Sequence, residues 1–297
     1  MKIKTLFLTT LSAIVIATAA AQEHSGIPDL LNDCRKEFSL DEIDGMRPRQ
    51  RGETPQGMAI SKGVMFALYH GGSCAAIELE SGRLLAEFPI DGAAGTHCNN
   101  ASFGVERADT LSPFPLLYVS ECFAPNRCFV EDMRVDGSRL AATIIYTGSG
   151  IDSFCDWCVD RENRRLYAYG RTPEKGVVIK RFGLPALSDA DENGVIELGD
   201  NDVQEEFVYP AGYFGIAQGS HIHDGLLYLP TGVPRQGHCR INAVSLDDGR
   251  LAGCTDIDGI ALEPEGVCVY DGRLWQFFAG GSGTVYSFGI ASGIKKL

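Results

Sequence analysis

Positively charged residues are scarce in this sequence. Its 297 residues include 26 Lys and Arg against 39 Asp and Glu, which gives a formal net charge of −13 at pH 7. Proteins that bind nucleic acid neutralise phosphates with Lys and Arg, and the same residues hold proteins on anionic membrane surfaces. The deficit argues against both kinds of partner. An acidic surface of this kind also keeps a protein soluble.

Long hydrophobic runs are absent after the first residues of the chain. A basic flank precedes one apolar run, Leu6 to Ala21, which ends in alanines, the pattern of a cleaved secretory signal. We expect residues 1–21 to be a signal peptide cut just before Gln22, and residues 22–297 to form a single domain. The run is short for a bilayer and no charged cluster follows it, so we expect no membrane anchor. The predicted location is the periplasm or the outside of the cell.

Helical periodicity is also missing, since no segment longer than a couple of turns shows it. Apolar runs instead alternate with Gly, Asp, Asn and Pro, a pattern typical of β-hairpins. Three segments align with one another, and each continues into a turn and a second strand: Pro55–Ile60, Ala217–Ile222 and Pro264–Val269. Two more units, which begin near His97 and Asp156, fit the pattern more loosely.

These repeats predict a β-propeller. Units of roughly 45 to 60 residues with four strands each are typical of propeller blades. The sequence therefore predicts an all-β propeller of five four-stranded blades, or six if the long third unit splits. The last unit lacks its outer strand, and we expect a strand from the N-terminal part, around Phe38 to Ile43, to complete it. Ring closure of this kind removes exposed sheet edges.

A family resemblance rests on the same repeats. The Gln-Gly and Glu-Gly openings, followed by Asp-Gly-x-Leu-Tyr or Asp-Gly-x-Leu-Trp, resemble the NHL-like and glutamine-cyclotransferase-like propellers. The stretch Thr54 to Pro89 looks closest to the first blade of the plant-type glutaminyl cyclases, which are five-bladed. The chain is also similar to exported bacterial propellers of uncharacterised function. The cyclase resemblance implies a five-bladed fold and an acyl-transfer enzyme with Glu265 as proton shuttle.

Ten cysteines follow the predicted signal peptide. An even number of cysteines in an exported chain predicts disulfides. Cys122 and Cys128 bracket a tight-turn sequence between two apolar runs, so we expect them to bond across a hairpin. Cys155-x-x-Cys158 has the spacing of a redox or zinc half-site. It lacks both a second half-site and a βαβ context, and we interpret it as structural.

Polar residues open the innermost strand of each predicted unit. Inner strands line the channel of a propeller, so these side chains should converge, and a concave pocket with convergent polar groups is the default ligand site. We predict a site for a small molecule or glycan fragment built from Gln56, His97, Asn99, Asp156, Trp157, Gln218, His221 and Glu265. Two alternatives stay open. The polar side chains could fasten neighbouring blades, and Trp157 could pack in a blade core instead of stacking on a sugar.

Two of these residues are candidate catalytic groups. Glycosidases need one protonated carboxyl group and one ionised partner, and Asp156 and Glu265 supply carboxyl groups from separate blades. The segment His221-Ile222-His223 could hold a metal ion, because alternate residues of a strand share a face. The same pattern fits a hydrogen-bonded channel wall.

An acidic loop is a candidate calcium site. Calcium prefers oxygen ligands at EF-hand spacing, with glycine at the sixth place for the sharp turn. Residues 189–200 have this spacing, with Gly194 at the sixth place. The predicted ligands are Asp189, Asp191, Asn193, Val195, Glu197 and Asp200. The twelfth place carries Asp where Glu is usual and no long helices flank the loop, so an Asn-Gly hairpin turn in an acidic insertion is the alternative.

The leading functional interpretation is a non-catalytic propeller that captures a small polar ligand or glycan fragment in its channel. The rival is an enzyme at the same mouth, either a glycoside-active hydrolase or lyase or a cyclase-like enzyme. A scaffold whose faces bind protein is a third hypothesis. Calcium is the one cofactor that the sequence suggests.

Overall fold

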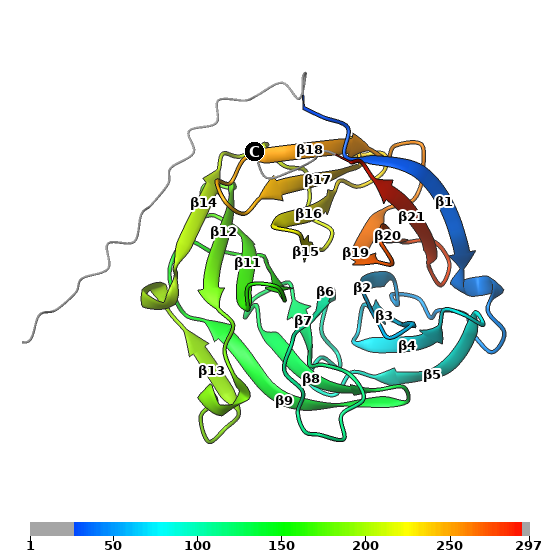
Figure 1. Ribbon diagram of the computed structural model, residues 1–297, viewed down its shortest axis with the longest axis horizontal. Coiled ribbons are helices and arrows are strands. Elements are labelled where there is room, and N and C mark those ends of the chain that lie inside the picture. Colours follow the sequence, from blue (N-terminus) through cyan, green and yellow to red (C-terminus); the bar gives the residue numbers. More distant parts are fainter. Residues whose placement is uncertain (1–26, 293–297) are drawn as a thin grey trace, which may run out of the picture.

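The computed structural model describes residues 27–292, which form 21 β-strands and three 3-10 helices of three residues each. The strands make five sheets around a central axis (Figure 1), which confirms the predicted five-bladed all-β propeller and excludes six blades. None of the helices in this part of the chain is long and apolar enough to cross a membrane. The predicted signal peptide, residues 1–21 with cleavage before Gln22, lies outside the described residues.

Each blade is an antiparallel meander that starts at the channel. Blade 1 consists of β2 (Pro55–Ser61), β3 (Val64–Tyr69), β4 (Ser73–Glu78) and β5 (Arg83–Pro89), and blade 2 of β6 (Cys98–Phe103), β7 (Leu117–Glu121), β8 (Cys128–Arg134) and β9 (Gly137–Tyr146). Blade 3 consists of β10 (Cys155–Asp160), β11 (Arg165–Arg171), β12 (Val177–Gly183) and β14 (Glu205–Tyr209). Blade 4 consists of β15 (His221–His223), β16 (Leu226–Thr231), β17 (Arg240–Ser245) and β18 (Leu251–Asp256), and blade 5 of β19 (Pro264–Tyr270), β20 (Arg273–Phe278), β21 (Thr284–Ile290) and β1 (Leu31–Ser39).

The ring closes through the N-terminal strand, as predicted. β1 pairs antiparallel with β21 along its whole length and becomes the outer strand of blade 5. The predicted limits, Phe38 to Ile43, are wrong: the strand starts seven residues earlier, at Leu31, and ends before the 3-10 helix η1 (Leu40–Glu42). Most side chains of β1 are exposed. The strand therefore lacks the apolar alternation that marks a half-buried strand in a sequence.

An insertion explains the length of the third unit. The segment between β12 and β14 contains η2 (Leu187–Asp189), β13 (Val195–Leu198) and η3 (Asp200–Asp202). β13 leaves its own blade and pairs in parallel with β9, so that blade 2 gains a fifth strand. The extra residues therefore extend an existing blade and do not start a sixth.

Glycines of the repeated openings let the innermost strands approach closely. A Cβ atom on Gly266 would lie 2.2 Å from the backbone nitrogen of Met58 on the neighbouring inner strand. A Cβ atom on Gly57 would lie 3.0 Å from the backbone carbonyl carbon of Asn100. Any side chain at these places would push adjacent inner strands apart. The motif that reveals the repeat in the sequence therefore has a packing role around the channel.

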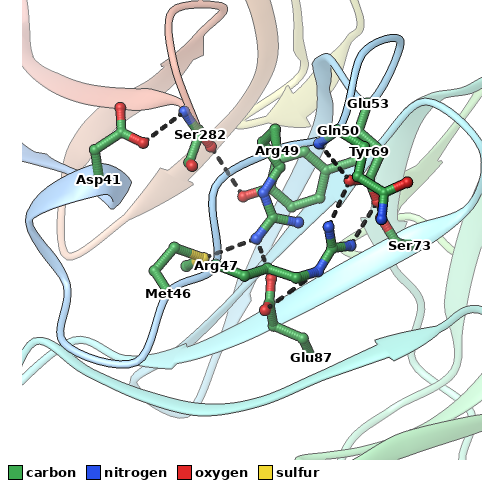
Figure 2. Close-up of polar contacts among 10 residues, drawn as sticks. All are labelled: Asp41, Met46, Arg47, Arg49, Gln50, Glu53, Tyr69, Ser73, Glu87 and Ser282. Atoms are coloured by element: carbon green, nitrogen blue, oxygen red, sulfur yellow. Dashed lines mark hydrogen bonds and ion pairs between the residues drawn. The ribbon is translucent and has the colours of Figure 1, made fainter.

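A polar cluster that is buried at Arg49, Tyr69 and Ser282 joins blade 5 to blade 1, a junction that we call the closing seam (Figure 2). Arg49 lies between η1 and β2, pairs with Glu87 of β5, and places its guanidinium carbon 4.1 Å from the ring centroid of Tyr69. The Tyr69 hydroxyl donates a hydrogen bond to the carbonyl oxygen of Ser282 at 2.9 Å. The Ser282 amide donates to Asp41 Oδ1 at 3.0 Å. These contacts connect both blades with the segment that links them.

The predicted disulfide between Cys122 and Cys128 is wrong for this structure, in which all ten cysteines are free thiols. Cys128 lies opposite Ser120 in the ladder between β7 and β8. Cys122 has left that hairpin: its amide donates to His97 O at 3.2 Å, and its carbonyl oxygen accepts from the Cys155 amide at 3.0 Å. The chain turns toward the next blade before Cys122 can face Cys128.

The Cys155-x-x-Cys158 pair has the structural environment that the sequence suggests. The two cysteines are three residues apart on β10, so their side chains lie on opposite faces of the sheet. Both are buried, Cys155 in the core between blades 2 and 3 and Cys158 in the core between blades 3 and 4. They therefore face different hydrophobic clusters.

Candidate ligand site at the channel mouth

Five predicted site residues lie at the starts of the innermost strands, four of them within a strand and one just before it. Gln56, Asn99, Asp156 and Glu265 are the second residues of β2, β6, β10 and β19, and Gln218 lies three residues before β15. All five are buried. The inner strands all start at the same end of the channel, so the five side chains belong to one mouth. We call this end the carboxyl mouth.

Two amides of the carboxyl mouth fasten neighbouring blades. Asn99 Nδ2 donates a hydrogen bond to Asp156 Oδ2 at 2.7 Å and so joins blade 2 to blade 3. Gln218 Nε2 donates to Glu263 Oε1 at 2.7 Å and so joins blade 4 to the residues that precede blade 5. Asn99 and Gln218 therefore each make a hydrogen bond between blades, as in the fastening alternative, although both bonds go to side chains.

The two carboxyl groups of this mouth have no cationic partner among the described residues. Asp156 is fully buried, and burial raises its pKa to about 7. Glu265 is 3% exposed, and burial, with the negative charges of Glu263 and Asp156, raises its pKa well above the usual range. Within residues 27–292, Oδ1 of Asp156 has no hydrogen-bond partner. The side chain of Gln276 donates a hydrogen bond to the backbone oxygen of Glu265, and no side chain of these residues donates one to the Glu265 carboxyl group.

Stability should fall as the pH rises from about 6.5 to about 8.5. Asp156 keeps its proton near neutral pH in the folded protein, whereas the unfolded chain has already lost it, so raising the pH through the folded pKa removes stability. One carboxyl group with a folded pKa of about 7 should lose about 1 kcal/mol over this range. Asp156→Asn should flatten the decline in the free energy of unfolding, measured in denaturant at both pH values. Titration of the histidines contributes equally in the wild type and the variant. An equally steep decline in Asp156→Asn would show that Asp156 is not its source.

The carboxyl mouth also has a rim, only part of which the sequence predicted. His97, just before β6, lies with its ring centroid 4.7 Å from that of His70 and 5.0 Å from that of Phe123. Burial and the neighbouring His70 lower the pKa of His97 to about 4. The Phe123 side chain is 56% exposed. His70 and Phe123 lie in loops after β3 and β7, where no residue pattern separates a site residue from any other loop residue.

Two predicted site residues lie elsewhere. Trp157 is fully buried, its ring packs against Phe182 at a centroid distance of 6.1 Å, and its Nε1 donates to Asn126 O at 2.9 Å. Because it follows Asp156 on the strand, it points to the opposite face, and its packing in the core excludes stacking on a ligand. His221 lies further along its inner strand and lines a cavity at the other end of the channel, which we call the far mouth.

The acidic loop predicted to bind calcium does not gather its ligands. Asp191 Oδ1 accepts hydrogen bonds from the backbone amides of Asn193 and Val195, at 2.9 and 2.8 Å, and so stabilises a tight turn. Asp200 Oδ1 accepts a hydrogen bond from the Tyr146 hydroxyl of β9 instead. Residues 27–292 contain no group of three or more His, Cys, Asp or Glu side chains that could hold a metal ion. Calcium binding by this loop stays a prediction.

Comparisons with known proteins bear on the fold alone. No protein-family model matches the chain, and no curated protein matches it. It is similar in structure to a glutaminyl cyclase from Myxococcus xanthus, at a TM-score of 0.54 and 11% identity, over 89% of this chain and 100% of that one. It is also similar to the tail fiber of Staphylococcus aureus phage P68, at a TM-score of 0.51 and 16% identity, over 89% of this chain and 54% of that one. At these identities the likenesses show the β-propeller fold and no family.

Proposed function

We propose that this protein is a binding propeller that captures a small polar ligand, such as a glycan fragment, at the carboxyl mouth. The observation that carries the proposal is the Glu265 carboxyl group, which is buried beside Asp156 without a cationic or hydrogen-bonding partner among the described side chains. A buried carboxyl group without partners destabilises a fold. Carboxyl groups with strongly perturbed pKa values cluster at functional sites of proteins.

Three acceptor groups would receive such a ligand. They are the Glu265 carboxyl group, Oδ1 of Asp156 and Oε1 of Gln56, and the last two atoms are buried without a hydrogen-bond partner among residues 27–292. A ligand rich in hydroxyl or ammonium groups supplies the donors that these acceptors need. Asn99 and Gln218 would hold neighbouring blades together through their hydrogen bonds. The exposed aromatic side chain of Phe123 would cover the ligand from the rim.

A variant of Glu265 tests this function. Glu265→Gln keeps the shape of the side chain but removes its charge, and hydrogen bonds to a charged group are worth about 1.4 kcal/mol more than neutral ones. Affinity for a ligand found by screening glycans and small polar amines should therefore fall about tenfold, with little change in the free energy of unfolding. Calorimetry in buffers of different ionisation enthalpy should also show that wild-type binding releases a proton.

The matched control is Glu80→Gln, which changes a carboxyl group in an exposed turn on blade 1. It should leave ligand affinity unchanged. If Glu265→Gln lowers the free energy of unfolding by about 1 to 3 kcal/mol and leaves affinity unchanged, Glu265 only fastens the ring and the proposal is wrong.

An enzyme at the same mouth is the second candidate function. The observation that favours it is the complete burial of Asp156 without a cation beside it, which raises its pKa to about 7, because a general acid or base works best when its pKa lies near the working pH. The screen should include glycosides and peptides with an amino-terminal Gln, since a structural neighbour is a glutaminyl cyclase. Turnover by the wild type that falls roughly 100-fold in Glu265→Gln, with binding retained, would favour the enzyme over the binding protein.

A further inference from the structure

A cavity of about 320 Å³ opens at the far mouth of the channel. All five blades contribute to its lining through residues at or just after the ends of their inner strands. The apolar part of the lining includes Ile60, Phe103, Ile222 and Val269. A concave site of this size, whose lining is about equally polar and apolar, can hold a small organic molecule that has both a polar group and an apolar part.

The polar part of the lining comes mostly from blades 3 and 4. Arg161 and Glu162 follow β10, and His221 and His223 belong to β15. Glu162 is the acidic residue of this lining, and it lies 3.8 Å from His223 Nδ1. The ion pairs among residues 27–292 do not include Arg161. Arg161 is therefore the cation of this mouth that is free to meet an anion.

His221 adds a hydrogen-bonding group that the fold leaves unused. Its Nδ1 is buried and has no hydrogen-bond partner among the described residues. Burial, and then the charges of His223 and Arg161, lower the pKa of His221 to about 3, so the ring is neutral at neutral pH. A neutral imidazole keeps one N–H donor and one acceptor nitrogen. It can therefore hydrogen-bond a ligand without carrying a charge into the cavity.

We propose that the far-mouth cavity is a second ligand site, which binds a small organic carboxylate with an apolar body. The Arg161 guanidinium would bind the carboxylate group through charge-assisted hydrogen bonds. His221 would offer a further hydrogen bond, and the apolar lining would take the rest of the molecule out of water. The carboxyl groups of Asp156 and Glu265 at the other mouth have no cationic partner among the described residues, so that mouth lacks the charge that would bind the same anion. This inference does not depend on the proposed function.

Benzoate is the probe that tests this site, with benzyl alcohol as its uncharged counterpart. Calorimetric titration of the full-length mature protein should give saturable benzoate binding that is at least about tenfold tighter than that of benzyl alcohol. Arg161→Gln should remove this preference. Arg164→Gln, which changes an arginine of the adjoining turn outside the cavity lining, should keep it.

His221→Phe separates binding from folding. The variant removes a ring nitrogen that has no partner, so stability should not fall, while benzoate affinity should drop several-fold. Glu265→Gln should leave benzoate binding unchanged, because it acts at the other mouth, and this separates a failure here from a failure of the proposed function. Equal affinity for benzoate and benzyl alcohol, no saturable binding, or loss of benzoate binding in Glu265→Gln would each overturn the proposal.

Discussion

Replacing Gly266 by alanine should lower the free energy of unfolding by about 3 kcal/mol or more. The new Cβ atom would lie 2.2 Å from the Met58 nitrogen and 2.6 Å from the Gly57 carbonyl carbon. Both atoms belong to the backbone of β2, which cannot move aside as a flexible side chain can. The inner strands of blades 5 and 1 must separate, and a close-packed interior resists even small changes in volume.

The matched control is Gly259→Ala in an exposed turn, where a Cβ atom meets nothing within 4 Å. Denaturant unfolding of wild type and both variants gives the comparison. Gly259→Ala should change stability by less than about 1 kcal/mol, in line with other exposed substitutions. A Gly266→Ala protein as stable as the control would show that the closing seam does not depend on direct contact between the inner strands.

Most of the fold could be predicted from the sequence because propeller blades are built from local hairpins. Each blade repeats an opening, a turn and an apolar strand at short range, so the repeat is visible in one chain. The pairing of strands that are far apart in the sequence could not be predicted. β1 is a largely exposed edge strand without apolar alternation. β13 (Val195–Leu198) crosses to another blade through a parallel ladder, and no local pattern reports the partner of such a strand.

For the candidate site, too, the repeat pattern predicted some positions correctly and others wrongly. Repeat register alone placed Gln56, Asn99, Asp156, Gln218 and Glu265 at one mouth, because equivalent positions of equivalent strands meet at the axis. The prediction for Trp157 was wrong because consecutive residues of a strand point to opposite faces of the sheet, and Trp157 follows Asp156. The prediction for His221 was wrong because this residue lies three positions after Gln218, which brings it toward the other end of the channel.

The cysteines show a further limit of sequence spacing. A short spacing such as that between Cys122 and Cys128 allows a disulfide but does not fix where the hairpin ends. In the structure the hairpin ends before Cys122, whose backbone bonds to His97 and Cys155 of neighbouring elements. Ladder register is a property of the folded blades, and the residues between the two cysteines do not determine it.

Replacing Arg49 by methionine should lower the free energy of unfolding by about 3 kcal/mol. The Arg49 side chain is 5% exposed and is the close partner of Glu87, which is itself 18% exposed (Figure 2). Methionine fills similar space but leaves Glu87 with a more distant cation, Arg47, whose Nε lies 3.6 Å from Glu87 Oε2. Arg47 is already engaged by two hydrogen bonds of 2.6 Å to Glu53. A largely buried carboxylate would thus lose its main partner.

The double variant Arg49→Met with Glu87→Met should recover most of this loss. Nε and Nη1 of Arg49 are buried without hydrogen-bond partners among residues 27–292, so the pair does not repay all of its desolvation, and apolar side chains of similar volume often replace such pairs at no net cost. Arg83→Met, which removes an exposed pair with Glu78, is the control and should change stability by less than about 1 kcal/mol. If the double variant is less stable than Arg49→Met alone, the closing seam depends on Glu87 itself. Its other contact, with Arg47, would then be what holds the linking segment against blade 1.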